Sequence, residues 1–310
     1  MSISTLSVCN APQPSLAVCD YKYSANELLL YTARDFQAFT ATNHEHNFIQ
    51  LWYVRQGMMR HTYGNITYMQ GRGNLILVPP LFEHALDSAF IKGTTEVFQL
   101  DISEQIIFDA VDADTSESLF DLIYLLPLLI NSNIIEPGLC LAPRTAVQIE
   151  SILVELSEHY NSRYGLSAKT LKAFMELLQL IALEYQSTLM LQHIELLEKY
   201  RDIIQNSFQY IKQNFMRKKL RIEKLYKQVL MSKTPFYSIF KLATGKPPNE
   251  YLRHLRIMYA CELLLGTDLS LYEISCECGF TDQTDLGRVF KQIWGISPKQ
   301  YREYYAKNNK

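Results

Sequence analysis

Three histidines and one glutamine lie at a spacing that could hold a divalent metal ion. His44 and His46 are followed closely by Gln50, and His84 comes later in the chain. Imidazole nitrogens suit Fe, Ni, Cu and Zn, and the side-chain oxygen of Gln50 could add a fourth donor. The spacing therefore allows a metal-dependent oxygenase or isomerase.

The same residues fit a second interpretation, in which they line a pocket for a small ligand or are ordinary core and surface histidines. We favour this interpretation, because a carboxylate ligand is missing and short histidine motifs have low specificity. It predicts no metal, no cofactor and no catalytic residue. It places an effector pocket, suited to an apolar or aromatic molecule with an anionic group, at His44, His46, Gln50, Trp52, Arg55 and His84.

A second group of side chains, in the last hundred residues, has the chemistry to bind DNA. Glutamine pairs well with adenine and arginine with guanine, which makes Gln283 and Arg288 candidates for base reading. Residues 201–310 hold 19 Lys and Arg against 10 Asp and Glu, whereas residues 1–200 hold 11 against 22. This asymmetry favours a polyanionic partner for the C-terminal third only. The expected phosphate contacts are Lys233, Lys241 and Lys291.

These side chains belong to a unit that occurs twice. The pattern Phe-Lys-x3-Gly-x2-Pro-x2-Tyr begins at Phe240 and again at Phe290, so that all five positions recur at an offset of 50. A repeat of this length indicates a duplicated supersecondary unit. Each copy is predicted to be a helix, a tight turn and a second helix that could enter the major groove. A helical repeat that binds only protein is the alternative.

Local signals place the helices of the two units. Ser232 is predicted to cap the second helix of unit one, and a long helix over Asn249–Leu265 joins the units. In unit two, Ser270 and Glu273 form a capping-box pattern, and Gly279 makes the turn. Thr281 or Asp282 caps the helix that follows, and the Ser297-Pro298-x-Gln300 pattern begins the last helix.

At these residues the chain resembles the DNA-binding domain of AraC/XylS transcriptional regulators. The resemblance covers about the last hundred residues and is carried by the repeated pattern, by Gly279-Phe280 and by Tyr301-Arg302. It implies two helix-turn-helix units joined by one long helix. By position, the implied base-reading residues are Thr234, Tyr237 and Ser238 in unit one, and Gln283, Thr284 and Arg288 in unit two. Ser238 and Asp285 depart from the family pattern, so the sequence of the DNA site does not transfer.

The N-terminal region resembles a cupin barrel, with Gln50 where metal cupins usually place Glu. The expected fold class is α+β with two domains: an N-terminal cupin-like β-barrel with flanking helices, and an all-α C-terminal domain. The predicted boundaries are a flexible arm over 1–20, an effector-binding and dimerisation domain over 21–192 (barrel 21–102, helices 103–192), and a DNA-binding domain over 203–310. Residues 186–202 contain no Gly or Pro, which predicts a short and partly helical join.

One helical stripe is a candidate dimer seam, formed by Ile149, Leu153, Leu156 and Tyr160. No apolar run is long enough to span a membrane, since Leu122–Ile130 is short and contains Pro127.

The predicted function is a cytoplasmic, sequence-specific transcriptional activator whose barrel senses a small molecule or dimerises. Its expected partners are double-stranded DNA, RNA polymerase and a second copy of the chain. A metal-dependent cupin enzyme fused to a helical DNA-binding domain is the alternative.

Overall fold

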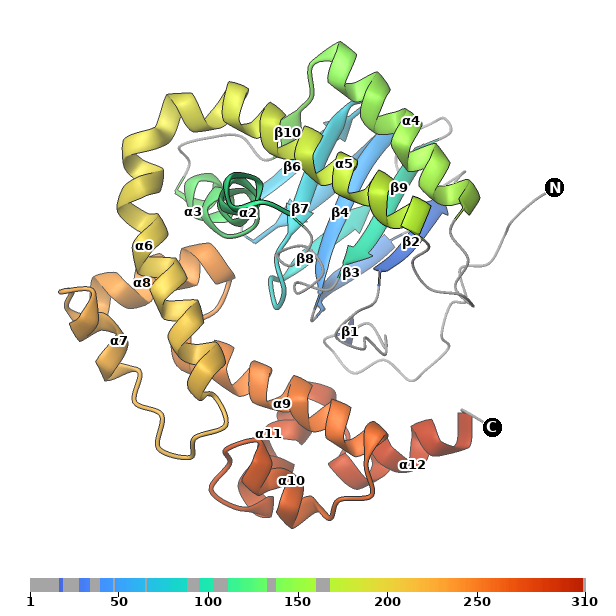
Figure 1. Cartoon of the computed structure of the whole chain (residues 1–310). Helices are drawn as coiled ribbons and strands as arrows, with labels where there is room; N and C mark the ends of the chain where they lie inside the picture. Colours follow the sequence, from blue (N-terminus) through green and yellow to red (C-terminus); the bar gives the residue numbers. More distant parts are fainter. Residues whose placement is uncertain are drawn as a thin grey trace.

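A computed structural model of the chain describes residues 17–18, 28–33, 40–46, 48–64, 66–87, 95–102, 111–132, 138–159 and 168–308. The N-terminal domain consists of strands covered by helices, and the C-terminal domain is entirely helical (Figure 1). This two-domain α+β arrangement confirms the fold class expected from the sequence.

The strands of the N-terminal domain form two five-stranded sheets. The first sheet has the order β1-β3-β8-β5-β6, and the second has the order β10-β7-β4-β9-β2. Neighbours are antiparallel, except that β1 runs parallel to β3. The bounds are β1 Ala17–Val18, β2 Leu28–Ala33, β3 Thr40–Glu45, β4 Ile49–Gln56, β5 Met58–Tyr63, β6 Ile66–Gly71, β7 Asn74–Val78, β8 His84–Asp87, β9 Glu96–Ile102 and β10 Leu139–Cys140.

The expected flexible arm over 1–20 is described only at Ala17 and Val18. These two residues pair with His44 and Glu45 as strand β1. At this point the prediction of a loose arm is wrong, because the backbone joins the edge of the first sheet. The rest of the arm lies outside the described residues.

Helices cover the second sheet and form the rest of the N-terminal core. They are α2 Ala113–Phe120, the π-helical segment η1 Asp121–Leu125, α3 Leu126–Asn131, α4 Pro143–His159 and α5 Ala168–Tyr185. Helices α4 and α5 pack on each other and lie across the face of the second sheet (Figure 1). The apolar run 122–130 is buried in η1 and α3. No helix among the described residues is long and apolar enough to cross a membrane.

A single long helix connects the two domains. After a second π-helical segment, η2 Gln186–Met190, helix α6 runs from Leu191 to Asn214 without a break. The sequence predicted only a short and partly helical join over 186–202. The absence of Gly and Pro over 186–202 instead allows one continuous helix, because nothing in that stretch interrupts the backbone hydrogen bonds.

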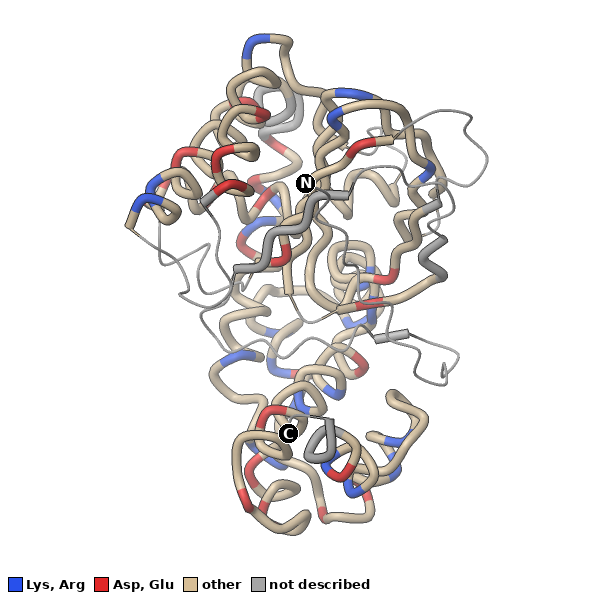
Figure 2. Tube along the Cα trace, turned by 90° about the vertical axis from the view of Figure 1, so that its right-hand side faces the viewer, with Lys and Arg blue, Asp and Glu red and all other residues tan. Residues whose placement is uncertain are grey.

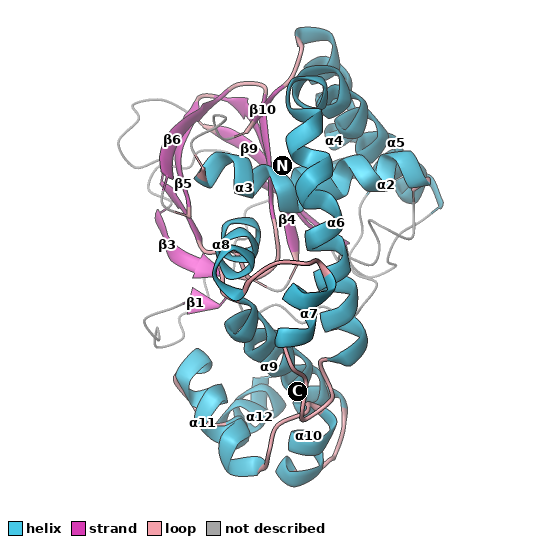
Figure 3. Cartoon of the chain, turned by 90° about the vertical axis from the view of Figure 1, so that its left-hand side faces the viewer, coloured by secondary structure: helices cyan, strands magenta, loops and turns pink. Residues whose placement is uncertain are grey.

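The C-terminal domain contains the two predicted units. Unit one is α7 Glu223–Gln228 and α8 Lys233–Thr244, and unit two is α10 Leu271–Glu277 and α11 Gln283–Trp294. Helix α9, Pro248–Gly266, joins them, and α12 spans Pro298–Asn308. Figure 3 shows α8 between the strands of the barrel and the other C-terminal helices. The repeated Gly245 and Gly295 end α8 and α11 with φ of 76° and 73°, a left-handed conformation that favours glycine.

The domains share one aromatic junction. The ring of Phe208, on α6, lies 4.4 Å from that of Tyr124 in η1, measured between centroids. The same ring lies 5.8 Å from Phe240 and 5.5 Å from Tyr251, which belong to the C-terminal domain. Helix α8 also contacts α3 and η1. The first helix-turn-helix unit is therefore packed against the N-terminal domain rather than held away from it.

Candidate nucleic-acid interface and barrel interior

Helix α8 separates a buried face from an exposed face, as the sequence predicted. Phe236 and Phe240 are fully buried in the core of unit one. The residues expected to contact DNA, Lys233, Thr234, Ser238 and Lys241, are exposed, and Tyr237 is half-buried. The Tyr237 hydroxyl accepts a hydrogen bond from Asn249 at 3.0 Å, and Lys233 Nζ lies 5.3 Å from the Tyr237 ring. Ser232 occupies the N-cap position, but its side chain makes no capping hydrogen bond, so that detail of the prediction is wrong.

Helix α11 presents its polar face in the same way. Asp282 caps the helix by accepting hydrogen bonds from the backbone amides of Thr284 and Asp285. Leu286, Val289 and Phe290 are buried, whereas Gln283, Thr284, Arg288 and Lys291 are exposed. Asp285, which departs from the family pattern, lies beside the expected base-reading residue Arg288. Its carboxylate accepts a hydrogen bond from Arg288 at 2.8 Å, so the two side chains form an ion pair on α11.

The two tight turns differ, although they occupy the same place in the repeat. Gly279 turns unit two with φ of 74°, and a side chain there would place its Cβ 2.6 Å from the carbonyl oxygen of Met216. Leu230 turns unit one with φ of 54°, and it is 95% exposed. Only glycine adopts these positive φ values without an energetic cost. The turn of unit two therefore has the residue that its backbone favours, whereas the turn of unit one has a leucine in an unfavourable conformation.

Two arginines tie the helices of the C-terminal domain together through backbone carbonyls. Arg256 of α9 donates to the carbonyl oxygens of Phe215 and Arg217, both at 2.7 Å. Arg302 of α12 donates to the carbonyls of Leu264 and Leu269. The long helix α9 is thereby tied to the segments before unit one and unit two. Lys and Arg lie on most of the C-terminal helices rather than on one of them alone (Figure 2).

The barrel interior holds four histidines close together. The ring of His84 lies 4.2 Å from His44, 4.9 Å from His46 and 5.6 Å from His61, measured between centroids. Burial lowers the pKa of His46 and of His61 to about 3, and it lowers that of His84 well below the usual value. These imidazoles are therefore neutral at physiological pH. His61 joins this group from β5, outside the spacing pattern of His44, His46, Gln50 and His84.

Gln50 connects the histidines to the second sheet. Its side-chain oxygen lies 3.1 Å from His84 Nε2 and accepts from Trp52 Nε1. Its amide donates to Asp101 at 2.9 Å. Five of the six predicted pocket residues are thus brought together inside the barrel. Within the described part of the chain, no group of three or more His, Cys, Asp or Glu is arranged to hold a metal ion.

Arg55 is the exception among the predicted pocket residues. Side chains alternate along β4, so Gln50 and Trp52 point between the sheets, while Tyr53 and Arg55 point to the other face. Arg55 accordingly pairs with Glu150 of α4 at 2.9 Å and with Glu96 at 3.5 Å. Its placement in the pocket was wrong, and the alternation along the strand was the signal that could have shown this.

The predicted dimer seam also needs correction. Ile149, Leu153 and Leu156 are buried in the core of this chain, and Tyr160 lies outside the described residues. An apolar stripe at helical spacing indicates a buried face but not what covers it. Here α5 and the second sheet cover it, so those three side chains are not available to a second copy.

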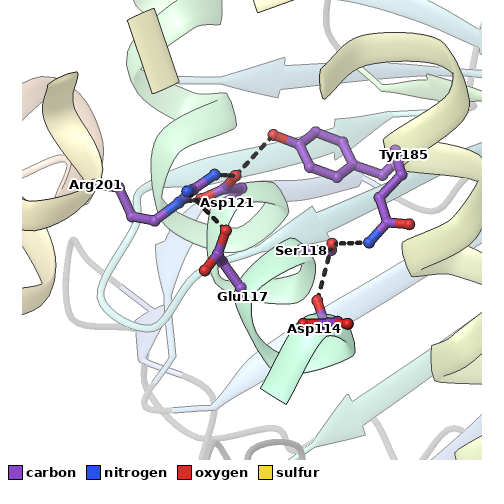
Figure 4. A network of polar contacts seen from close by, with 7 residues as sticks. Asp114, Glu117, Ser118, Asp121, Tyr185 and Arg201 are labelled. Carbon is purple, nitrogen blue, oxygen red and sulfur yellow. Dashed lines mark hydrogen bonds and ion pairs between the residues drawn. The ribbon is translucent and has the colours of Figure 1, made fainter. Parts of the chain in front are cut away.

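A polar network fixes helix α6 to the N-terminal domain (Figure 4). Arg201 of α6 donates from two nitrogens to the carboxylate of Asp121, at 2.8 and 2.5 Å, and pairs with Glu117 at 2.7 Å. Tyr185 donates to the same carboxylate at 3.2 Å. Asp121 is fully buried, and its hydrogen bonds raise the pKa of Arg201. The network holds the middle of the interdomain helix against the N-terminal domain.

Comparison with known proteins gives a match for each domain. Residues 28–178 match the AraC-like ligand binding domain, and residues 225–304 match a helix-turn-helix domain. Over 107 residues the chain is 31% identical to the lactose operon transcription activator of Staphylococcus xylosus, which covers 34% of this chain and 38% of that protein. Over 85 residues it is 35% identical to the MmsAB operon regulatory protein of Pseudomonas aeruginosa, covering 27% of this chain and 28% of that one.

A solved structure matches over a greater length. The structure of ToxT from Vibrio cholerae with a bound unsaturated fatty acid aligns with 89% of this chain and 94% of that one, at 16% identity and a TM-score of 0.46. The chain spans less than half the length of the two regulators described above.

Proposed function

This chain belongs to the AraC family by both of its domains, and we propose that it is a sequence-specific activator of transcription that binds double-stranded DNA. The observation that carries the proposal is the pair of helices α8 and α11, each the second helix of a helix-turn-helix unit. Both bury an aromatic face and expose polar and basic side chains, which is what insertion into a major groove requires. Helix α9 holds the two at a fixed separation.

The assignment of DNA contacts follows from the exposed faces. We assign base reading to Thr234, Tyr237 and Ser238 of α8 and to Gln283, Thr284 and Arg288 of α11. We assign phosphate contacts to Lys233, Lys241 and Lys291. Exposure of these side chains supports the assignment, because a residue must leave the protein core to reach a base edge or a phosphate. Unit two has the side chains with the more specific hydrogen-bonding patterns.

The N-terminal domain, proposed to span 21–192, is assigned to effector sensing. The enclosed group of His44, His46, Gln50, Trp52 and His84 supports this role, since these polar side chains converge inside the barrel. The DNA-binding domain is proposed to span 203–310, and RNA polymerase is the proposed partner for activation. A homodimer is proposed to form on the outer faces of α4 and α5, where Val147 and Leu183 are exposed.

Selection from a random duplex library by the full chain tests the central proposal. We expect an enriched sequence with two short conserved blocks about one helical turn apart, and an affinity that falls steeply as salt rises. Recovery of no consensus, together with affinity that does not depend on salt, would refute DNA recognition.

Sedimentation of the wild type and of Val147→Glu tests the dimer separately, because the variant should shift the equilibrium toward the monomer.

A further inference from the structure

One carboxylate of the barrel is buried against the DNA-binding domain. Glu45, at the end of β3, is 3% exposed. Its Oε2 lies 2.5 Å from Nζ of Lys246, in the turn between α8 and α9, and its Oε1 lies 2.6 Å from Nδ1 of His254 on α9. The side chains of Lys246 and His254 are themselves nearly covered. The three residues are far apart in the sequence and meet only because the domains touch.

This cluster is stable in two arrangements. In the closed one the three groups are paired and the domains are in contact, and in the open one the groups are separated and exposed to water. A carboxylate removed from water needs a cationic partner, here Lys246, and the loss of that partner leaves an uncompensated buried charge. Burial alone would raise the pKa of Glu45, but contacts with His254 and Lys246 outweigh it and lower that pKa. Among the described residues, Glu250 also lies close, 4.0 Å from Lys246 Nζ and 3.9 Å from His254 Nε2, and it is about half exposed. The closed arrangement is therefore held by a compact group of charges.

Strand β3 connects this cluster to the barrel interior. Glu45 stands between His44 and His46 in the sequence, and both of these rings contact His84 inside the barrel. The backbone of this segment is also tied to the next rim loop, because the Leu81 amide donates to the His46 carbonyl at 2.7 Å. A displacement of the backbone at His44 or His46 also moves Glu45, since a single peptide unit separates it from each of them.

The same rim makes a second contact with the same turn. Gly245 precedes Lys246 and has φ of 76°, and a Cβ there would lie 3.2 Å from the ring of Phe82. Phe82 is buried and is followed two residues later by His84. An ionic contact and an aromatic contact thus join the barrel rim to the end of α8, and both originate next to the interior histidines.

We propose that Glu45, Lys246 and His254 form an interdomain latch, which holds the first helix-turn-helix unit against the barrel and transmits changes in the barrel interior to it. A ligand that moves His44 or His46 shifts Glu45, breaks the ion pairs and frees unit one to change its position relative to the barrel. Unit two lacks this contact and keeps its structure. The role of the latch in regulating DNA binding rests on the proposed function. The coupling between the barrel and unit one does not depend on that function.

Hydrogen exchange of the full chain without DNA tests the latch. In Glu45→Gln we expect the amides of residues 244–246 and the C-terminal half of α8 to exchange at least tenfold faster than in the wild type. Peptides from α10 and α11 should keep their wild-type rates, which shows that the chain is folded. Glu83→Gln is the matched control, because it removes the same charge from an exposed position on the same rim and should change neither region.

A second pair of variants keeps the test decisive. Lys246→Gln should accelerate exchange in β3 and in residues 244–246, and the double variant with Glu45→Gln should exchange more slowly than either single variant, because the Glu45–Lys246 pair then leaves no buried charge without its partner. Unchanged exchange in both single variants, or equal acceleration in Glu83→Gln, would overturn the latch. Failure of the wild type to bind any duplex would refute the proposed function instead, and the exchange results would be unaffected.

Discussion

The turn of unit two offers a quantitative test of how the DNA-binding domain is held together. Substitution of Gly279 by Ala adds a single methyl group at φ of 74°, where its carbon would lie 2.6 Å from the Met216 carbonyl oxygen and 2.8 Å from that of Phe215. These carbonyls cannot move away easily, because Arg256 donates to the Phe215 oxygen. The left-handed backbone costs about 1–2 kcal/mol for a residue with a side chain. The steric overlap costs about 1–3 kcal/mol.

The reduced entropy of the unfolded chain returns less than about 1 kcal/mol. We therefore expect Gly279→Ala to lower the free energy of unfolding of the C-terminal domain by about 2–4 kcal/mol. Leu230→Gly is the matched comparison, since it occupies the same turn in unit one with nothing packed on it. Glycine at 230 would relieve the backbone strain of the positive φ, but it would also raise the conformational entropy of the unfolded chain. These two effects oppose each other, so the free energy of unfolding should change by no more than about 1 kcal/mol.

Urea unfolding followed by tryptophan fluorescence measures both changes. The chain has two tryptophans, and Trp294 lies in α11 of unit two, so a Trp52→Phe background isolates the signal of that domain. Gly279→Ala should move the midpoint to lower urea without changing the slope. A loss below about 1 kcal/mol for Gly279→Ala, or an equal loss for Leu230→Gly, would show that the close approach of Met216 does not constrain the turn.

Three further predictions concern the barrel, the interface and the interdomain helix. Because the pKa values of His46 and His61 are about 3 in the folded chain and near 6.5 in the unfolded chain, the unfolded chain binds more protons between these values. Stability should therefore fall as pH drops below 6.5, by about 2 kcal/mol per histidine at pH 5, and a flat unfolding profile between pH 7.5 and 5 would contradict this. Arg288→Ala should cost about 1–3 kcal/mol in DNA binding and relax the preference at one base pair, measured on single-base variants of the selected site; uniform weakening would make Arg288 a phosphate contact. Arg201→Met should destabilise the chain by about 3–5 kcal/mol because it leaves the Asp121 carboxylate buried without its cationic partner, and the double variant with Asp121→Asn should recover most of this loss in urea unfolding.

Local rules predicted the C-terminal domain well because its signals are local. The capping box of Ser270 and Glu273 is present, with both reciprocal hydrogen bonds. The Ser297 and Gln300 pair begins α12 in the same way. The inward and outward faces of α8 and α11 also follow from the helical period alone. Each of these features depends on residues within one turn of each other, which a sequence shows directly.

The contacts between elements were not predictable in the same way. The apolar stripe of α4 was visible, but the sequence did not show that its own domain covers it. The alternation of side chains along β4 does predict the correct face for Arg55. An even or odd position along the strand, and not the type of residue, decides which face a side chain occupies. Glu45 and Lys246 had no local signal at all, because a single carboxylate and a single lysine are common everywhere. Their pairing depends on how two separately recognisable domains pack.

The contacts around Glu45 have a consequence for protein engineering. Each domain matches known proteins on its own, which invites exchange of one domain for that of a relative. In this chain the barrel buries the Glu45 carboxylate against Lys246, so a chimaera whose helical domain has no base at that position would leave the acid buried without its ion pair. A working hybrid must therefore keep Lys246 together with the barrel. Because Lys246 follows α8, the boundary at which the two halves can be exchanged lies beyond unit one rather than at its start.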